Sequence, residues 1–237
     1  MNESYLLKAG IVGNIVSVVG VVICNKYIVE TDGFHFMVFL SFLHFFFTVI
    51  GTRVLLWKEV FPYKAAQSNF IMPLSILSLL SVAFMNLNLK RNSVGFYQLS
   101  KLACIPVTLS IEYLAYNKTI SRLVQMTLVP ILFGVGFATI YDLDINMIGT
   151  IFAIIAVLAT ATSQIYLKQI QKPLDCTPLQ ILYHTSPLVC LGMLMLVPFF
   201  DNYKEILEFE FTIGCIFRIG EYTLSDLDSL YALCPTL

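Results

Sequence analysis

Seven long apolar segments constrain this chain more than any other feature of its sequence. They lie near residues 6–24, 34–52, 70–89, 93–115, 123–141, 145–166 and 179–200. A helix needs about 20 apolar residues to cross the hydrocarbon core of a bilayer. Because a spanning segment has no water to satisfy its backbone groups, each is expected to be an α-helix. The sequence therefore predicts an all-α polytopic membrane protein with seven spans.

Composition supports the membrane class and disfavours several others. Of the 237 residues, 58% are hydrophobic and 12% are charged, whereas soluble domains carry about 25% charged residues. The net charge of −1 gives no general attraction to nucleic acid. The six cysteines form no CxxC pair, so neither a metal site nor a disulfide framework is expected. Walker, GxGxxG, HExxH and nucleophile-elbow motifs are absent from the sequence, so we expect no catalytic residue and no cofactor.

Positive charges in the short loops predict the orientation of the chain. One side carries eight of them and the other side carries four, and the richer side is expected to face the cytosol. The richer side has Lys8, Arg53, Lys58, Lys64, Lys118, Arg122, Lys168 and Lys172; the poorer side has Lys26, Lys90, Arg91 and Lys204. The N-terminus is therefore predicted to be cytosolic. The glycosylation sequon that begins at Asn117 falls on the cytosolic side and is expected to stay unmodified.

Lys101 is the most informative charge, because it lies well inside the 93–115 segment. Helical spacing places Tyr97 one turn before it, with Thr108 two turns and Glu112 three turns after it, on nearly the same face. One interpretation is structural, with the lysine snorkelling to an interface or pairing with an acid. The favoured interpretation is a substrate or ion pathway, because a lysine in a water-filled cavity offers a point charge that suits a phosphate.

Other polar residues in the spans have weaker claims. Asn86 and Asn88 lie near the non-cytosolic end of the 70–89 segment, where capping or helix pairing explains them as well as ligand contact does. Tyr183 and His184 lie in the 179–200 segment, and a hydrogen-bonded structural role for the histidine is as well supported as a place in a pathway. The 145–166 segment is dense in Ala, Gly, Thr and Ser, which favours close helix packing.

Several motifs, in order along the chain, resemble a known family. NLNLKRNSVGFYQLSKLACIP (Asn86 to Pro106) matches the pattern N-x-[SN]-L-x-x-N-[ST]-V-x-x-x-Q-[LV]-x-K-x-x-x-x-P of the solute carrier 35 and triose-phosphate translocator family, in the drug/metabolite transporter superfamily. Its E branch is the most similar. Further resemblance is carried by CNKYI, by the segment from Lys118 to Gly149 and by LQILYHTSPL (Leu179 to Leu188). Together these motifs cover about residues 8 to 202.

The resemblance implies a fold and a binding site. The family's drug/metabolite transporter fold has ten helices in two inverted halves, with the substrate near mid-membrane between them. A lysine before the proline of the fourth helix contacts the substrate phosphate there, and Lys101 matches that lysine. The residues expected to bind substrate are Lys101, Tyr97, Gln98, Asn86, Tyr183 and His184. The family's F-Y-N-N stretch on the seventh helix is replaced by Leu182 to Thr185, so its nucleobase preference does not transfer.

The resemblance also divides the chain and implies its activity. Residues 1–141 are expected to form the first five-helix repeat, and 142–202 the first two helices of the second repeat. The charge-interrupted tail 203–237 stands where three further helices would follow, so we expect a C-terminally truncated form with about seven of ten helices. The implied function is antiport of nucleotide-sugars or sugar-phosphates across a Golgi or endoplasmic reticulum membrane. The alternative is a non-transporting isoform that binds or regulates a full-length transporter.

The expected partners follow from that function. They are a nucleotide-sugar or phosphorylated sugar, a nucleotide or phosphate as counter-substrate, and the lipid bilayer, with no nucleic acid. An oligomer would be formed with another copy of the chain or with a related subunit.

Overall fold

A computed structural model describes residues 36–118, 121–122, 126–130, 133–134, 137, 146–201 and 206 of this chain. Within these ranges it contains α2 (Met37–Trp57), α3 (Ser68–Arg91), α4 (Val94–Tyr116), α6 (Met147–Leu174) and α7 (Pro178–Phe200). No strand occurs among the described residues, which confirms the all-α prediction. Five predicted spans are thus helices. Segment 6–24, most of segment 123–141, the loop 142–145 and nearly all of the tail 203–237 lie outside the described residues, as does the CNKYI motif.

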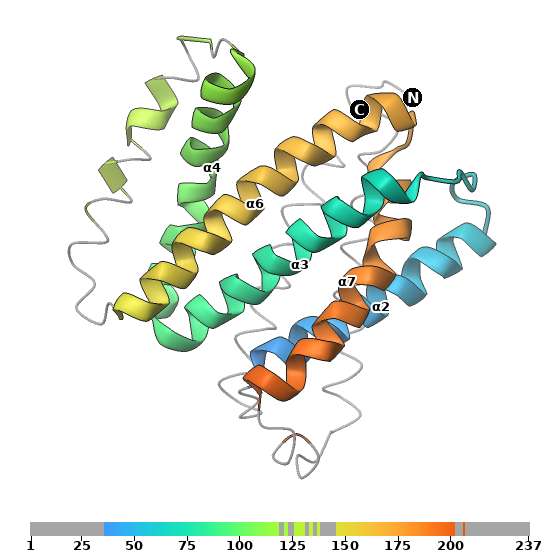
Figure 1. Cartoon of the computed structure of the whole chain (residues 1–237), viewed down its shortest axis with the longest axis horizontal. Helices are drawn as coiled ribbons and strands as arrows, with labels where there is room; N and C mark the ends of the chain where they lie inside the picture. Colours follow the sequence, from blue (N-terminus) through green and yellow to red (C-terminus); the bar gives the residue numbers. More distant parts are fainter. Residues whose placement is uncertain are drawn as a thin grey trace, which may run out of the picture. The chain divides into compact units, whose positions relative to one another are not determined.

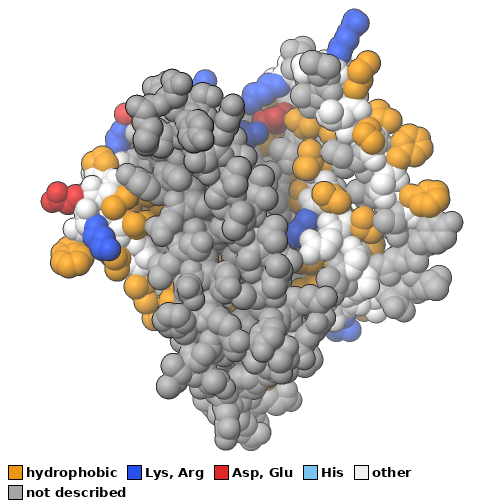
Figure 2. All heavy atoms as spheres, turned by 180° about the vertical axis from the view of Figure 1, so that it is seen from behind, with side chains coloured by type: hydrophobic (Ala, Val, Ile, Leu, Met, Phe, Trp, Pro, Cys, Tyr) orange, Lys and Arg blue, Asp and Glu red, His pale blue; other side chains and the backbone are white. Residues whose placement is uncertain are grey.

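Four of these helices are long and apolar enough to cross a membrane, namely α2, α3, α6 and α7. Large apolar side chains are exposed along them, with Trp57 and Met147 each 82% exposed. Figure 2 shows such side chains in orange on the described surface. An exposed apolar surface of this extent suits helices whose solvent is lipid.

Local sequence explains where α4 and α7 begin. Ser93 precedes α4, and its side chain accepts a hydrogen bond from the backbone N–H of Phe96 at 3.0 Å. Thr177 precedes α7 and forms a capping box with Gln180, while Pro178 occupies the first turn. Both arrangements satisfy backbone donors that a helix leaves free at its start. Helix α4 ends at Asn117, which takes the left-handed conformation with φ 49°.

The described residues within 1–72 and 174–237 belong to one compact unit, here called unit 1. In its described part, α2 packs against α7, and the two helices run side by side in Figure 1. The start of α2 is joined to the end of α7, because the backbone N–H of Phe39 donates to Asp201 Oδ2 at 2.9 Å. At the opposite end, the loop 58–67 after α2 contacts α7 through buried Phe61 and Leu179.

Residues 73–173 form the second compact unit, unit 2, which holds most of α3, α4 and most of α6. Its apolar cluster consists of Met85, Cys104, Ala156 and Val157. The hydroxyls of Ser81 and Thr160 are hydrogen-bonded between α3 and α6. On α6 the buried positions include small residues, with Ala156 and Ala161 fully buried. This confirms the close packing predicted for the 145–166 segment.

Candidate functional site

Lys101 is exposed on α4. Its ammonium Nζ lies 4.4 Å from the centroid of the Tyr97 ring, one helical turn away. Tyr97 is half-buried and packs on the apolar cluster of unit 2. A cation over an aromatic face is attracted by the ring's negative face. Among the ion pairs of the described residues, none involves Lys101, so its charge is seated but not neutralised.

The polar face expected to join Lys101 to Glu112 is divided in the structure. Glu112 is buried, and its Oε1 lies 3.4 Å from Lys118 Nζ and 3.5 Å from Lys168 Nζ. Thr108 is also buried; its hydroxyl donates to the backbone oxygen of Cys104 at 2.7 Å. Neither residue therefore faces the same surroundings as Lys101.

The physical reason is the drift of the buried stripe around α4. Buried side chains occur at every fourth residue, at Phe96, Ser100, Cys104, Thr108 and Glu112. Four residues are slightly more than one turn, so the stripe rotates by about 40° at each step. It reaches the direction of Lys101 only between Thr108 and Glu112, about two to three turns further along the helix. At its own level, Lys101 lies beside the stripe and stays exposed.

Gln98 and Asn86 belong to unit 2 with Lys101. Gln98 is exposed on α4, and Asn86 is half-buried on α3. Of the predicted site residues in the described structure, Tyr97 is the one that contacts Lys101. The other two stay predictions.

Tyr183 and His184 lie on α7 in unit 1, within an aromatic cluster. The rings of Phe61, Tyr63 and His184 meet Tyr183 with centroid distances of 6.2, 6.0 and 5.2 Å. His184 Nε2 lies 2.8 Å from the backbone oxygen of Lys64. Because a carbonyl oxygen can only accept, Nε2 carries the proton and only Nδ1 is left to accept a hydrogen bond. The histidine thus has a structural bond to the loop after α2.

Sequence reasoning missed the role of Arg53, which it treated only as a loop charge. The guanidinium Cζ of Arg53 lies 4.6 Å from the centroid of the Tyr183 ring. Both predicted tyrosines therefore have a cation over one face. The two residues are 130 positions apart in the chain, and no local pattern signals such a pair.

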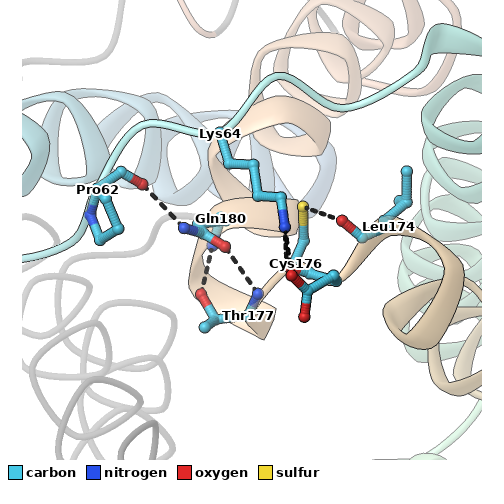
Figure 3. A network of polar contacts seen from close by, with 7 residues as sticks. Pro62, Lys64, Leu174, Cys176, Thr177 and Gln180 are labelled. Carbon is cyan, nitrogen blue, oxygen red and sulfur yellow. Dashed lines mark hydrogen bonds and ion pairs between the residues drawn. The ribbon is translucent and has the colours of Figure 1, made fainter.

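The loop after α2 is fixed to the start of α7 by further polar contacts (Figure 3). Buried Gln180 donates from Nε2 to the backbone oxygen of Pro62 at 2.8 Å, and its Oε1 accepts from the Thr177 backbone N–H at 2.8 Å. Lys64 Nζ pairs with Asp175 Oδ2 at 2.7 Å. This ammonium holds the pKa of the Asp175 carboxyl below its ordinary value.

Sequence reasoning also missed a chain of buried side-chain hydrogen bonds in unit 2. Asn92 Nδ2 donates to Asn88 Oδ1 at 2.7 Å, and Asn88 Nδ2 donates to Ser100 Oγ at 3.2 Å. Asn92 Oδ1 accepts from the backbone N–H of Asn146 at 2.8 Å. The sequence signal was the pair of amides at Asn86 and Asn88, but it did not show which of the two is buried. Asn88 is fully buried.

The described residues include no group of three or more His, Cys, Asp or Glu side chains placed to hold a metal ion. The described polar groups offer hydrogen bonding and charge complementarity. Cations seated on aromatic rings suit a ligand that carries negative charge.

Comparison with known proteins adds the family context. The model of the Triose-phosphate Transporter family matches residues 12–213. UDP-xylose transporter 3 of Arabidopsis thaliana is 36% identical over 226 residues, covering 92% of this chain and 63% of the relative. UDP-xylose transporter 2 is 34% identical, with 92% and 64% covered. UDP-rhamnose/UDP-galactose transporter 1 of the same plant is 33% identical, with 87% and 61% covered. The chain thus spans less than two thirds of the length of these relatives.

Proposed function

We infer that this chain, which belongs to the Triose-phosphate Transporter family, serves the exchange of nucleotide-sugars across a Golgi or endoplasmic reticulum membrane. The family is one of transporters rather than enzymes, and the long apolar helices make the chain a multi-pass membrane protein. Three relatives are named as transporters of UDP-xylose, UDP-rhamnose or UDP-galactose. These names support a nucleotide-sugar as substrate more than a simple sugar-phosphate.

The single observation that carries the proposal is the exposed, unneutralised charge of Lys101. The residue lies about 6 Å from the middle of α4, at a rise of about 1.5 Å per residue. The sequence predicts that α4 spans the membrane, and a lysine near the centre of a spanning helix costs roughly 2.5–3.5 kcal/mol. Lys101 makes no ion pair with a described carboxylate that would offset this cost. A substrate phosphate would supply the missing negative charge.

The proposed site uses Lys101 to bind the diphosphate of the nucleotide-sugar. Tyr97 holds the ammonium in place through its ring. Gln98 and Asn86 are proposed to hydrogen-bond other parts of the substrate. In unit 1, Tyr183 and His184 on α7 stay predicted substrate contacts. Nδ1 of His184 is the nitrogen left for a ligand, because its Nε2 is bound to the loop.

The same charge offers a physical reason for exchange rather than one-way flow. A bare ammonium inside the membrane is unfavourable, whereas an ammonium bound to phosphate is neutralised. The occupied protein would therefore change conformation more readily than the empty one. A nucleotide or phosphate would then occupy Lys101 on the return step, which makes it the proposed counter-substrate. The cytosolic N-terminus and an oligomeric assembly are further parts of this proposal.

The test is uptake into proteoliposomes loaded with UMP, with a panel of UDP-sugars outside. We expect Lys101→Ala to lower uptake at least about tenfold, because a hydrogen bond to a charged group contributes about 1.5–3 kcal/mol. Lys58→Ala is the matched control, since Lys58 is an exposed lysine just after α2, and it should leave uptake unchanged. Normal uptake by Lys101→Ala would contradict the phosphate role. Substrate binding without uptake would favour the alternative, a binding partner of a longer transporter.

A further inference from the structure

The buried hydrogen bonds between α3, α4 and the start of α6 form one continuous relay. We call the side chains of Asn92, Asn88 and Ser100, with the backbone N–H of Asn146, the amide relay. Each member donates to the next: Asn146 to Asn92 at 2.8 Å, Asn92 to Asn88 at 2.7 Å, and Asn88 to Ser100 at 3.2 Å. The three side-chain members are at most 9% exposed. Buried bonds aligned in one sense polarise one another and are costly to break.

Both ends of the amide relay are anchored to helix backbone. The Ser100 hydroxyl donates to the backbone oxygen of Phe96 at 2.9 Å. At the other end, Asn146 Oδ1 accepts from the backbone N–H groups of Ile148 and Gly149 and so caps α6. A Cβ at Gly149 would lie 2.6 Å from Asn92 Nδ2. The Asn92 side chain thus fills the space that this glycine leaves open.

The amide relay ends at the residue directly before Lys101. Successive side chains on a helix point about 100° apart, so the direction of Ser100 sets the direction of Lys101. The next buried residue of the stripe, Cys104, belongs to the apolar cluster of unit 2, and hydrophobic contacts are non-directional. The hydrogen bond from Asn88 to Ser100 adds a directional restraint on the rotation of α4. On its other side, Lys101 rests on Tyr97, which packs on the apolar cluster.

We propose that the amide relay is a positioning element: through Asn88 and Ser100 it fixes the rotation of α4 and holds Lys101 in the direction needed to bind a substrate phosphate. The proposal rests on the phosphate-binding function proposed above for Lys101. Asn88 and Ser100 touch no substrate in this scheme. They act only through the helix that carries the lysine.

The test separates phosphate binding from the rest of ligand binding. The affinities of UDP and of uridine are measured by calorimetry on the detergent-purified chain, and their ratio reports the contribution of the phosphates. We expect Ser100→Ala and Asn88→Ala to lower this ratio about three- to tenfold, the range that corresponds to loss of one hydrogen bond, while uridine affinity stays unchanged. Ser100→Thr keeps the hydroxyl and should restore the ratio.

The matched control is Ser110→Ala, because Ser110 is an exposed serine on the same helix, and it should leave the ratio unchanged. A purely structural role would weaken UDP and uridine equally, or lower only the unfolding temperature, and either result would overturn the proposal. If Asn88→Ala does not fold, Ser100→Ala decides, because it leaves the Asn88–Asn92 bond in place.

A second measurement keeps this proposal separate from the proposed function. Lys101→Ala should remove the UDP preference; an unchanged ratio in that variant would refute the phosphate role itself. The position of residue 101 is then read from Lys101→Cys, labelled with a water-soluble maleimide. We expect the labelling rate to change when Ser100→Ala is added. An unchanged rate would show that the amide relay does not set the direction of residue 101.

Discussion

The two compact units use their polar side chains in different ways. In unit 1, Gln180, His184 and Lys64 bind the backbone of segments outside their own helix or loop: Pro62, Lys64 and Asp175 provide the carbonyl oxygens. These contacts fix the loop after α2 against α7. In unit 2, bonds between side chains join different helices: Asn88 bonds to Ser100, and Ser81 to Thr160.

A second contrast is between polar side chains that bond to other parts of the protein and those that a ligand could bind. Glu112, Asn88, Gln180 and His184 all have partners within the protein. Among the described residues, Lys101 lies over the Tyr97 ring and has no carboxylate partner, and Arg53 lies likewise over the Tyr183 ring. In a membrane protein, a charged side chain in a span is a candidate for a ligand-binding site. It is a better candidate when no described carboxylate neutralises its charge.

The largest expected effect tests the packing of unit 2. Gly149→Ala places a Cβ 2.6 Å from Asn92 Nδ2, and two hydrogen bonds hold that side chain. Overpacking costs about 1–3 kcal/mol, so we expect lower stability in thermal unfolding in detergent. Gly134→Ala is the matched control, because the Cβ it adds meets nothing within 4 Å beyond its own stretch of helix.

A double variant sharpens the same comparison. With Asn92→Ala already present, the added Cβ at Gly149 meets no amide, and its cost should disappear. Independent, additive costs would show that Asn92 and Gly149 are not packed against each other.

The next effect tests the loop attachment of unit 1. Gln180→Ala removes the bonds to the backbone of Pro62 and of Thr177. We expect a loss of about 1–2 kcal/mol in the free energy of unfolding, since a hydrogen bond contributes roughly 0.5–1.5 kcal/mol. Gln169→Ala changes an exposed glutamine on α6 and should have little effect. If Gln180→Ala and Gln169→Ala lowered stability equally, the bonds of Gln180 would not fix the loop after α2 against α7.

A smaller effect is expected at the buried carboxylate of unit 2. Glu112→Gln keeps the size of the side chain but removes its attraction to Lys118 and Lys168, whose side chains are 55% and 59% exposed. Water around the exposed lysines screens their attraction to Glu112, so we expect the free energy of unfolding to fall by about 0.5–1 kcal/mol. Chemical unfolding of the single and double variants with Lys168→Ala would measure the coupling; zero coupling would contradict the ion pair.

The smallest effect is the pH dependence of the Lys64–Asp175 pair. The pKa of Asp175 is lowered in the folded protein, so its stabilisation is complete above the unfolded pKa of about 3.9. It is lost as the pH falls through the lowered pKa. Asp175→Asn should therefore unfold slightly below the temperature of the unchanged protein at pH 7, and the difference should vanish in strong acid. A difference that grows on acidification would have the wrong sign.

The sequence predicted the positions of the helices more accurately than their ends. Segments 34–52 and 145–166 correspond to α2, which continues to Trp57, and to α6, which continues to Leu174. Hydropathy marks the part of a helix that lipid surrounds, but backbone hydrogen bonding continues past that boundary. Lys168 and Lys172 lie on this extension of α6, and their charge ended the apolar segment without ending the helix.

At the candidate site, the sequence predicted residues but not their partners. Spacing within α4 correctly paired Tyr97 with Lys101, because that contact is local. It did not pair Glu112 with Lys168, Asn92 with Asn146, or Arg53 with Tyr183. Those contacts join different helices or the segments that flank them, and helical periodicity carries no information about which helices are neighbours.

Trp57 ends α2 beside the loop that is fixed to α7, and it is the single tryptophan of the chain. Its ring is 82% exposed, as suits an aromatic side chain at the level of lipid headgroups. The protein therefore contains a natural fluorophore at one edge of unit 1, free of any background from a second indole. Quenching of its emission by lipids brominated at different depths would locate the end of α2 in the bilayer without any label.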